Sequence, residues 1–306
     1  MTRRCLALLL ALCLLLTVSA CAEPHQVSEL SELPQTDGFL SEGEDPVYYK
    51  DHSGGYWLYV SDTVRVEITR YQSSSPLLTW YIADLQLAEG SSLYTVSSSD
   101  TTGKKNSYPQ TMALAGRAVY AQNGDFYSYR VANDRYPGII IRNGSILYKK
   151  TYSKLVYALP NLATMAFYPS GKAEVNEAWE VTAQEYIDRG ATTVVAFGPI
   201  LLRDGELQDI DNKAYNAKEP RSCFGIVDTR HYVGLLVEGR NNHSDGATLT
   251  TCAELLADYG CWDAINLDGG NTSAMLFMGE SVMLNDLGGV DENDRAIPDI
   301  LCVGSY

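Results

Sequence analysis

The residues of this sequence that could carry chemistry gather where apolar runs end. The clearest case is CWDAINLDGGNTSAMLF (261–277), in which a strand-forming run stops at Asp268 and two glycines, followed by three small polar residues. Such Asp-Gly and Gly-Asn pairs are common in hairpin turns, but glycines beside a carboxylate also let a backbone approach a ligand closely. The turn preferences of these residues favour the hairpin slightly, and a ligand pocket stays open as the second interpretation.

Four segments share this design of an apolar strand that runs into glycine and polar residues. They read YAQNGDFY (120–127), VAFGPILLRDGE (195–206), EPRSCFGIVD to LLVEGRNNHSDG (219–246) and INLDGGNTSAM (265–275). An isolated charge beside a buried strand is costly unless it is paired or used. We expect about half of the charged residues at these corners to contact a substrate and the others to form structural ion pairs. These residues are Asp125, Arg221, Glu238, Arg240 and Asp268.

Other catalytic and metal-binding patterns are missing from the sequence. Ser273 has no G-x-S-x-G context, and no H-E-x-x-H, Walker or dinucleotide-binding glycine pattern occurs. The acidic run 291–295 lacks the full spacing of an EF-hand, and the cysteines lack the paired spacing of a zinc site. Among the histidines, only His243, close after Arg240, is worth considering for a site. We therefore expect no metal and no cofactor.

The N-terminus has the pattern of an export signal. A basic Thr2-Arg3-Arg4 is followed by an apolar run from Cys5 to Leu16, and then by Val18-Ser19-Ala20-Cys21. This order resembles a bacterial lipobox, in which the cysteine is lipidated, and we favour it over ordinary cleavage nearby with Cys21 as a bystander. We expect a signal peptide over 1–20, a lipid on Cys21, an acidic flexible tether over 21–45 and a folded domain over 46–306. The mature protein would then be anchored to the outer face of the bacterial cell membrane.

The elements that must position the corners are mostly strands. Residues 56–72 and 78–88 alternate apolar with polar residues, and hairpins are expected about Asn143-Gly144 and Ser170-Gly171. Helices are expected over 181–190 and 248–261, each ending at a glycine. This pattern predicts an α+β fold of strand-rich mixed sheets with two or three helices.

The net charge and the cysteines limit the possible binding partners and bear on the cellular compartment of the protein. The net charge is −15, and −17 without the two arginines of the leader, which makes nucleic acid a poor partner. An anionic substrate would therefore need arginines gathered locally. Four cysteines remain after Cys21, each among apolar neighbours, so buried free thiols are the first expectation. Export permits disulfides, and Cys252 with Cys261 is the pair to test first.

Taken in order, five motifs resemble the phosphodiester glycosidase family. They are NGDFY, FGPILLRDG, PRSCFGI, LLVEGR and INLDGGNTSAM, and the tail LNDLGGVDENDRAIPDILCV is similar to the closing segment of the family. Two positions depart from its pattern. Glu238-Gly239-Arg240 stands where the family usually has Asp-Gly-Arg, and Asn271-Thr272-Ser273 follows the two glycines where a third Gly and a Ser are common.

The resemblance implies hydrolysis of a sugar, an N-acetylhexosamine, joined through its anomeric carbon to a phosphodiester. Glycoside hydrolysis commonly uses two carboxyl groups, and we assign them to Asp125 and Asp268. The planar forks of Arg221 and Arg240 would hold the charge of the leaving phosphate. The backbone N–H groups of two glycines would assist, and polar side chains would bind the substrate; these are Gly269, Gly270, Asn123, Glu238, Asn271 and Ser273.

Two further functions stay open on the sequence. One is hydrolysis of an ordinary glycosidic bond in wall glycan on the same fold. The other is a surface glycan-binding lipoprotein without turnover. The intact set of carboxylates and arginines argues against the second, and the change at Glu238 leaves the substrate open.

Overall fold

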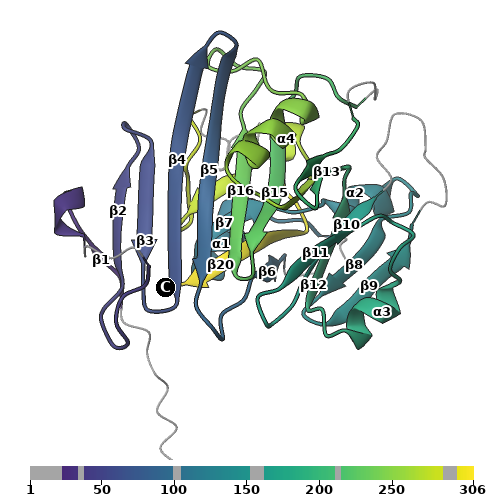
Figure 1. The fold of residues 1–306 in the computed structure, drawn as a ribbon, viewed down its shortest axis with the longest axis horizontal. Coiled ribbons are helices and arrows are strands. Elements are labelled where there is room, and N and C mark those ends of the chain that lie inside the picture. Colours follow the sequence, from purple (N-terminus) through teal and green to yellow (C-terminus); the bar gives the residue numbers. More distant parts are fainter. Residues whose placement is uncertain (1–22, 34–37, 99–104, 152–161, 211–214, 285–294) are drawn as a thin grey trace, which may run out of the picture.

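The computed structural model describes residues 23–33, 38–98, 105–151, 162–210, 215–284 and 295–306, so the predicted signal peptide and Cys21 lie outside the described residues. Within these residues the strands form three sheets, and four α-helices accompany them (Figure 1). The predicted α+β fold is confirmed, with one or two helices more than expected. No described helix has the length and apolar character needed to cross a membrane.

The largest sheet has ten strands and carries most of the molecule. Seen in order across the sheet, its strands are β1 (His25–Gln26), β2 (Val47–Asp51), β3 (Tyr56–Val60), β4 (Val64–Ser74), β5 (Leu77–Leu87), β16 (His231–Val237), β15 (Arg221–Asp228), β17 (Asp263–Asn266), β13 (Ile200–Arg203) and β14 (Glu206–Leu207). The alternating segments 56–72 and 78–88 correspond to β3, β4 and β5, as predicted.

Two five-stranded sheets complete the fold. One has the order β11 (Ala173–Asn176), β10 (Ala163–Phe167), β12 (Thr193–Phe197), β8 (Gly138–Arg142) and β9 (Ser145–Lys150), and it contains both predicted hairpins. The other has the order β19 (Glu280–Ser281), β18 (Met275–Phe277), β7 (Ala118–Asn123), β20 (Asp299–Ser305) and β6 (Tyr94–Ser97).

The two predicted helices form because their ends are capped. In α3 (Ala183–Asp188), Thr182 and Glu185 form a reciprocal capping box, and in α4 (Leu249–Asp258) the Thr248 hydroxyl accepts from the N–H of Thr251. The sequence interpretation missed α1 (Pro109–Ala115) and α2 (Tyr127–Ala132). Both have no more than seven residues and no side-chain cap, and the one start signal is Pro109 at the first position of α1.

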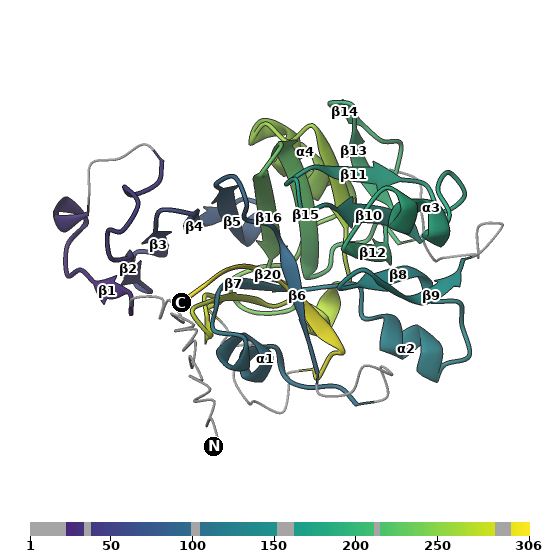
Figure 2. The ribbon, with the colours of Figure 1, turned by 90° about the horizontal axis from the view of Figure 1, so that it is seen from below.

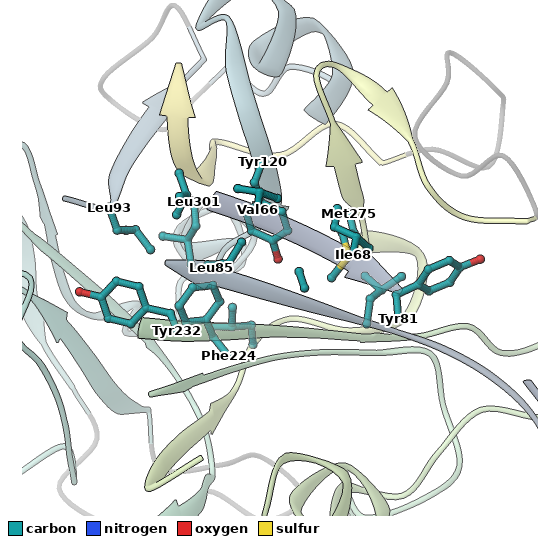
Figure 3. Packing of buried hydrophobic residues seen from close by; sticks show 14 of the residues in the cluster. Val66, Ile68, Tyr81, Leu85, Leu93, Tyr120, Phe224, Tyr232, Met275 and Leu301 are labelled. Atoms are coloured by element: carbon teal, nitrogen blue, oxygen red, sulfur yellow. The ribbon is translucent and has the colours of Figure 1, made fainter. Parts of the chain in front are cut away.

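The elements pack in layers, and the two largest apolar clusters among the described residues lie between these layers. Figure 2 shows α4 on one side of β16 and β15, the sheet with β7 and β20 on their other side, and α1 beyond it. β5 explains how one strand serves both clusters: Leu78 and Ile82 face α4, while the alternate residues Tyr81, Ala83 and Leu85 face β7 and β20. Figure 3 shows this second cluster, in which Val66 of the ten-stranded sheet meets Tyr120 and Leu301 of the sheet with β7 and β20.

The described part of segment 21–45 differs from the predicted flexible tether. β1 pairs in parallel with β2, and the short 3₁₀ turn Leu30–Glu32 follows it. Val27, Leu33 and Leu40 are buried against Leu58 and Val60 of β3. These scattered apolar residues have no period that a sequence pattern would reveal, yet together they cover the outer face of an edge hairpin.

The stretch between β17 and β18 settles the question raised by its turn residues. β17 belongs to the ten-stranded sheet and β18 to the sheet with β7, so residues 267–274 connect two sheets and do not form a hairpin. The connection contains the 3₁₀ turn Gly270–Thr272. This crossing brings Asp268 to the seam between the sheets.

Candidate functional site

The ends of three neighbouring strands of the ten-stranded sheet, β16, β15 and β17, lie side by side. Arg221 at the start of β15 is paired with Val237 at the end of β16, and Cys223 is paired with Asn266 at the end of β17. Because neighbouring strands are antiparallel, the loops that leave β16 and β17 lie beside the start of β15. These loops enclose a cleft of about 340 Å³.

The cleft combines arginines and carboxylates with a few apolar side chains and a glycine-rich floor. Its lining residues are Phe197, Gly198, Tyr215, Glu219, Pro220, Arg221, Arg240, Leu249, Asn266, Asp268, Gly269, Gly270, Asn271 and Arg295. Six residues predicted to act at a site are therefore gathered here: Arg221, Arg240, Asp268, Gly269, Gly270 and Asn271. The cleft has the mixture of acids and several cations expected where a charged substrate reacts.

Asp268 has the most perturbed environment in the cleft. Burial raises the pKa of its carboxyl from 3.8 to about 6, although a hydrogen bond from Thr272 and the charges of Arg130 and Arg295 act in the opposite direction. Its backbone is fixed too, because the Asp268 carbonyl accepts from Asn123 Nδ2 at 2.7 Å. A carboxylate of this kind is ionised at neutral pH and is a stronger base than an ordinary one.

Asn123 positions this acid from behind and does not line the cleft. It is fully buried, and besides its bond to Asp268 its Oδ1 accepts from the N–H of Ala274 at 3.0 Å. One side chain therefore ties down both ends of the 268–274 connection. The prediction that Asn123 binds sugar does not fit this position.

Asp125, the predicted partner of Asp268, also lies behind the cleft. Its carboxylate is fully buried and accepts from Arg142 Nη2 at 3.0 and 3.1 Å and from the N–H of Ala196 at 3.0 Å. Arg142 Nε donates in turn to Asp299 at 2.6 Å. The three residues form a buried ionic cluster that joins β8, β20 and the end of β7. A carboxylate held in this way has no path to an anomeric carbon, so a direct catalytic role for Asp125 does not fit the structure.

Glu238 is a second predicted site residue that the structure places elsewhere. It is fully buried, and its carboxylate accepts from the Tyr81 hydroxyl at 2.7 Å, from Asn241 Nδ2 at 3.0 Å and from the N–H of Leu284 at 2.7 Å. Asn241 belongs to the same loop as Glu238, while Tyr81 and Leu284 come from distant segments of the chain. Glu238 therefore organises the loops behind the cleft, and direct substrate contact is not its role.

Arg221 lines the cleft but is also part of its framework. Its Nε donates to the Ala247 carbonyl at 3.1 Å, and its Nη2 donates to the carbonyls of Tyr215, at 3.1 Å, and Ala217. Its Nη1 makes none of these three bonds. Arg221 thus supplies charge to the cleft while holding two loops, so replacing it would disturb both binding and structure.

Arg240 is held across the mouth of the cleft by two residues that also line it. Its Nε and Nη2 lie 2.7 and 2.6 Å from Glu219 Oε2, and its Nη1 donates to Asn271 Oδ1 at 3.0 Å. Its backbone has a φ of +60°, which is uncommon for a residue with a side chain. The guanidinium is therefore fixed on both edges.

Three glycines allow the backbone to close tightly around Glu219 and Pro220. A Cβ on Gly269 would lie 2.6 Å from the Pro220 carbonyl oxygen, and one on Gly246 would lie 2.7 Å from the Glu219 backbone. A Cβ on Gly239 would lie 2.8 Å from Gly246 and 2.9 Å from the Pro220 nitrogen. All three glycines serve close packing at this point, and Gly269 also lines the cleft.

The two remaining predicted positions lie outside the lining. Ser273 is buried, and its Oγ has no hydrogen-bond partner among the described residues. His243 is exposed and donates its N–H to Asn241. The four described cysteines, Cys223, Cys252, Cys261 and Cys302, are buried free thiols, so the Cys252–Cys261 disulfide is not formed.

Several residues of the site were missed on the sequence. Arg130 donates to the Ala196 carbonyl at 3.2 Å, and its guanidinium lies 4.5 Å from the centre of the Phe197 ring in the cleft wall. Arg142 and Asp299 were overlooked as partners of Asp125. Glu219 is the first residue of the quoted segment EPRSCFGIVD, and its acidic type two residues before Arg221 was the available signal.

The charges in the cleft oppose those of the whole protein. Arg221, Arg240 and Arg295 line it against the two carboxylates Glu219 and Asp268, so the described lining is cationic by one charge when both are ionised. The protein as a whole carries −15. A local reversal of sign favours an anionic ligand.

The fold and the site define an α+β protein with a cationic cleft built around the perturbed acid Asp268. Residues 116–304 match the phosphodiester glycosidase family, and the chain belongs to that family. It is also similar to the SPbeta prophage-derived uncharacterized protein YomE of Bacillus subtilis (strain 168), with 29% identity over 196 residues. That match covers 63% of this chain and 29% of the relative, so the chain spans less than a third of its length.

Solved structures share the fold at low sequence identity. The zebrafish N-acetylglucosamine-1-phosphodiester alpha-N-acetylglucosaminidase catalytic domain, auto-inhibited by its pro-peptide, matches with a TM-score of 0.59 and 16% identity, over 79% of this chain and 83% of that one. A hypothetical protein from Synechocystis matches with a TM-score of 0.57 and 10% identity, over 87% and 64% of the two chains. These likenesses establish the architecture alone.

Proposed function

We propose that the protein hydrolyses a sugar-1-phosphodiester, releasing the sugar, an N-acetylhexosamine, and a phosphate monoester. The observation that carries this proposal is the cationic cleft around Asp268 in a strongly acidic protein. Membership of the phosphodiester glycosidase family supports the same class of reaction. The name of the zebrafish structural relative points to this substrate class as well.

In the proposed reaction the bond between the anomeric carbon and the phosphate oxygen breaks, and its electron pair stays on the phosphate. Water adds its hydroxyl to the anomeric carbon, and Asp268 accepts the proton of that water before passing it to solvent. The raised pKa of Asp268, about 6, suits this role as a base near neutral pH. A phosphate is a good leaving group, so holding its charge matters more than protonating it, and the lining arginines supply that charge.

Arg295 offers the sharpest test of the phosphate. It lines the cleft and donates to the Thr272 hydroxyl at 3.4 Å, a weak bond whose loss should disturb the fold little. We expect Arg295→Gln to lower kcat/KM for a sugar-1-phosphodiester by roughly ten- to a hundredfold, as the loss of a charge-assisted hydrogen bond does. An aryl glycoside of the same sugar carries no phosphate and should lose less than about threefold.

The matched control is Arg203→Gln, which removes one positive charge from an ion pair with Glu180 outside the cleft lining. Arg203→Gln should leave the activity on the sugar-1-phosphodiester and on the aryl glycoside unchanged. An equal loss on both substrates in Arg295→Gln would remove the phosphate from the mechanism and favour an ordinary glycosidic bond. Binding of wall glycan without turnover of any substrate would instead point to a glycan-binding lipoprotein.

We also propose that the mature protein is anchored to the outer face of the membrane through a lipid on Cys21. The support is the run Val18-Ser19-Ala20-Cys21 after an apolar segment, which lies outside the described residues. In a bacterial host, Cys21→Ala should move the protein from the membrane fraction to soluble fractions or the medium. Identical partitioning of the two forms in a detergent phase separation would rule out the anchor.

A further inference from the structure

We propose that Glu219 matches the charge of the cleft to a singly charged phosphodiester and disfavours the doubly charged monoester that hydrolysis releases. This inference rests on the proposed function and concerns the same cleft. Glu219 was not among the residues expected to act on the sequence. Its position in the structure, in the cleft lining and paired with Arg240, is what assigns it this role.

The carboxylate of Glu219 offsets the positive charge of Arg240, which a bound substrate would otherwise meet in full. Its Oε2 lies 2.7 Å from Arg240 Nε and 2.6 Å from Nη2, and both side chains line the cleft. Asn271 engages the third nitrogen at 3.0 Å. Arg240 can therefore orient towards a bound anion only against the pull of Glu219, and its charge is largely offset within the cleft.

The pair rests on a fixed backbone, because Glu219 forms an antiparallel bridge with Ala247. Its N–H donates to the Ala247 carbonyl at 3.1 Å, and its carbonyl accepts from the Ala247 N–H at 3.0 Å. Gly246 approaches the same backbone so closely that a Cβ would lie 2.7 Å from it. The Glu219 and Arg240 side chains are 37% and 53% exposed, so their ion pair contributes little to stability, and its effect is on the local potential of the cleft.

Counting charges shows which ligand this arrangement suits. With both lining carboxylates ionised, the three lining arginines leave the described cleft at +1, which one phosphodiester charge neutralises. A phosphate monoester carries about −1.5 to −2 at neutral pH and would leave an excess of negative charge beside Glu219 and Asp268. Without the charge of Glu219 the lining would be at +2, and the monoester would be the better match. Glu219 would thus promote release of the product.

Methyl phosphate and dimethyl phosphate test this directly, because they differ by one methyl group and one charge. Their dissociation constants are measured by NMR titration of the full-length protein at pH 8, where methyl phosphate is a dianion. We expect Glu219→Gln to tighten methyl phosphate about tenfold and dimethyl phosphate about threefold, since the electrostatic effect scales with ligand charge. Higher salt should reduce both changes.

Asp245→Asn is the matched control, because it removes the same negative charge as Glu219→Gln. Asp245 pairs with Lys218 at 3.8 Å and lies outside the cleft lining. The variant should change either affinity by less than about twofold, because exposed charges are screened by solvent and salt. Equal tightening of both anions by Glu219→Gln, or none, would overturn the charge-matching role while leaving the proposed function intact. Failure of both anions to bind any form of the protein would overturn the proposed function, and this inference with it.

Discussion

Replacing Asp268 by Asn is expected to lower the turnover of a sugar-1-phosphodiester by at least about a thousandfold while the protein stays folded. Asn has nearly the same shape as Asp, so the backbone bond from Asn123 to the Asp268 carbonyl should persist. It cannot accept the proton of the attacking water. Steady-state kinetics of the purified wild-type and variant proteins, with circular dichroism as a check on folding, measure the effect. Near-normal turnover in a folded variant would exclude Asp268 from the reaction.

The pH dependence provides an internal control for this prediction. Because Asp268 must be ionised to act as a base, wild-type kcat/KM should rise about tenfold per pH unit below about pH 6 and level off above it. Any residual activity of Asp268→Asn should lack that rise. A wild-type profile that instead falls above about pH 6 would show that the protonated form is the active one.

Stability should move in the opposite direction from activity. The pKa of Asp268 in the folded protein, about 6, lies above the ordinary value of 3.8, so the folded state binds the proton more tightly than the unfolded state. This group therefore favours folding at low pH, and that contribution is lost as the pH rises from about 4 to about 6. The Tm of Asp268→Asn relative to wild type should be higher at pH 8 than at pH 4.

Replacing Arg142 by Met is expected to destabilise the protein by about 3–5 kcal/mol, the effect of leaving buried charges without their partner. Asp125 and Asp299 would then face each other in the interior without the guanidinium that both contact. Burial already raises the pKa of Asp299, and the charge of Arg142 opposes that shift. Urea unfolding monitored by circular dichroism at pH 7 measures the loss.

A triple variant separates charge from packing in this cluster. Asp125→Asn, Arg142→Met and Asp299→Asn together remove all three charges, and the amide oxygen introduced by Asp125→Asn can still accept from the N–H of Ala196. The triple variant should therefore be more stable than Arg142→Met alone. A loss of less than about 1 kcal/mol in Arg142→Met would mean that the cluster contributes little to folding.

Most of the fold followed from local patterns. The alternation of 56–72 and 78–88 is the pattern of strands, and the caps at Thr182 and Thr248 mark the starts of α3 and α4. α2 could not be predicted in this way, because it follows Phe126 in the left-handed region at a φ of +44° and has no side-chain cap. The packing of Val27, Leu33 and Leu40 onto β3 depends on contacts distant in sequence, which no periodicity records.

Only part of the site could be predicted from the sequence, and the reason for this limit is geometric. A sequence shows that Asp125, Glu238 and Asp268 each follow a strand, but not which way each chain turns afterwards. The connection after β17 crosses to another sheet and presents Asp268 to the cleft. Asp125 turns inward instead and meets Arg142, whose place on β8 is set by a different sheet. The arrangement of the sheets therefore decides which predicted residues line the cleft and which lie behind it.

The tight glycine packing around Glu219 and Pro220 has a consequence for how this cleft could diversify over evolution. Gly239, Gly246 and Gly269 leave no room for a side chain, so these positions tolerate few substitutions. The side chain of Glu219 lines the cleft and is itself partly exposed, so its exchange would release Arg240 but leave the backbone packing intact. Proteins with a neutral or an acidic residue at position 219 would then favour ligands of different charge while the backbone stays the same. Substrate preference can drift here while the architecture stays conserved.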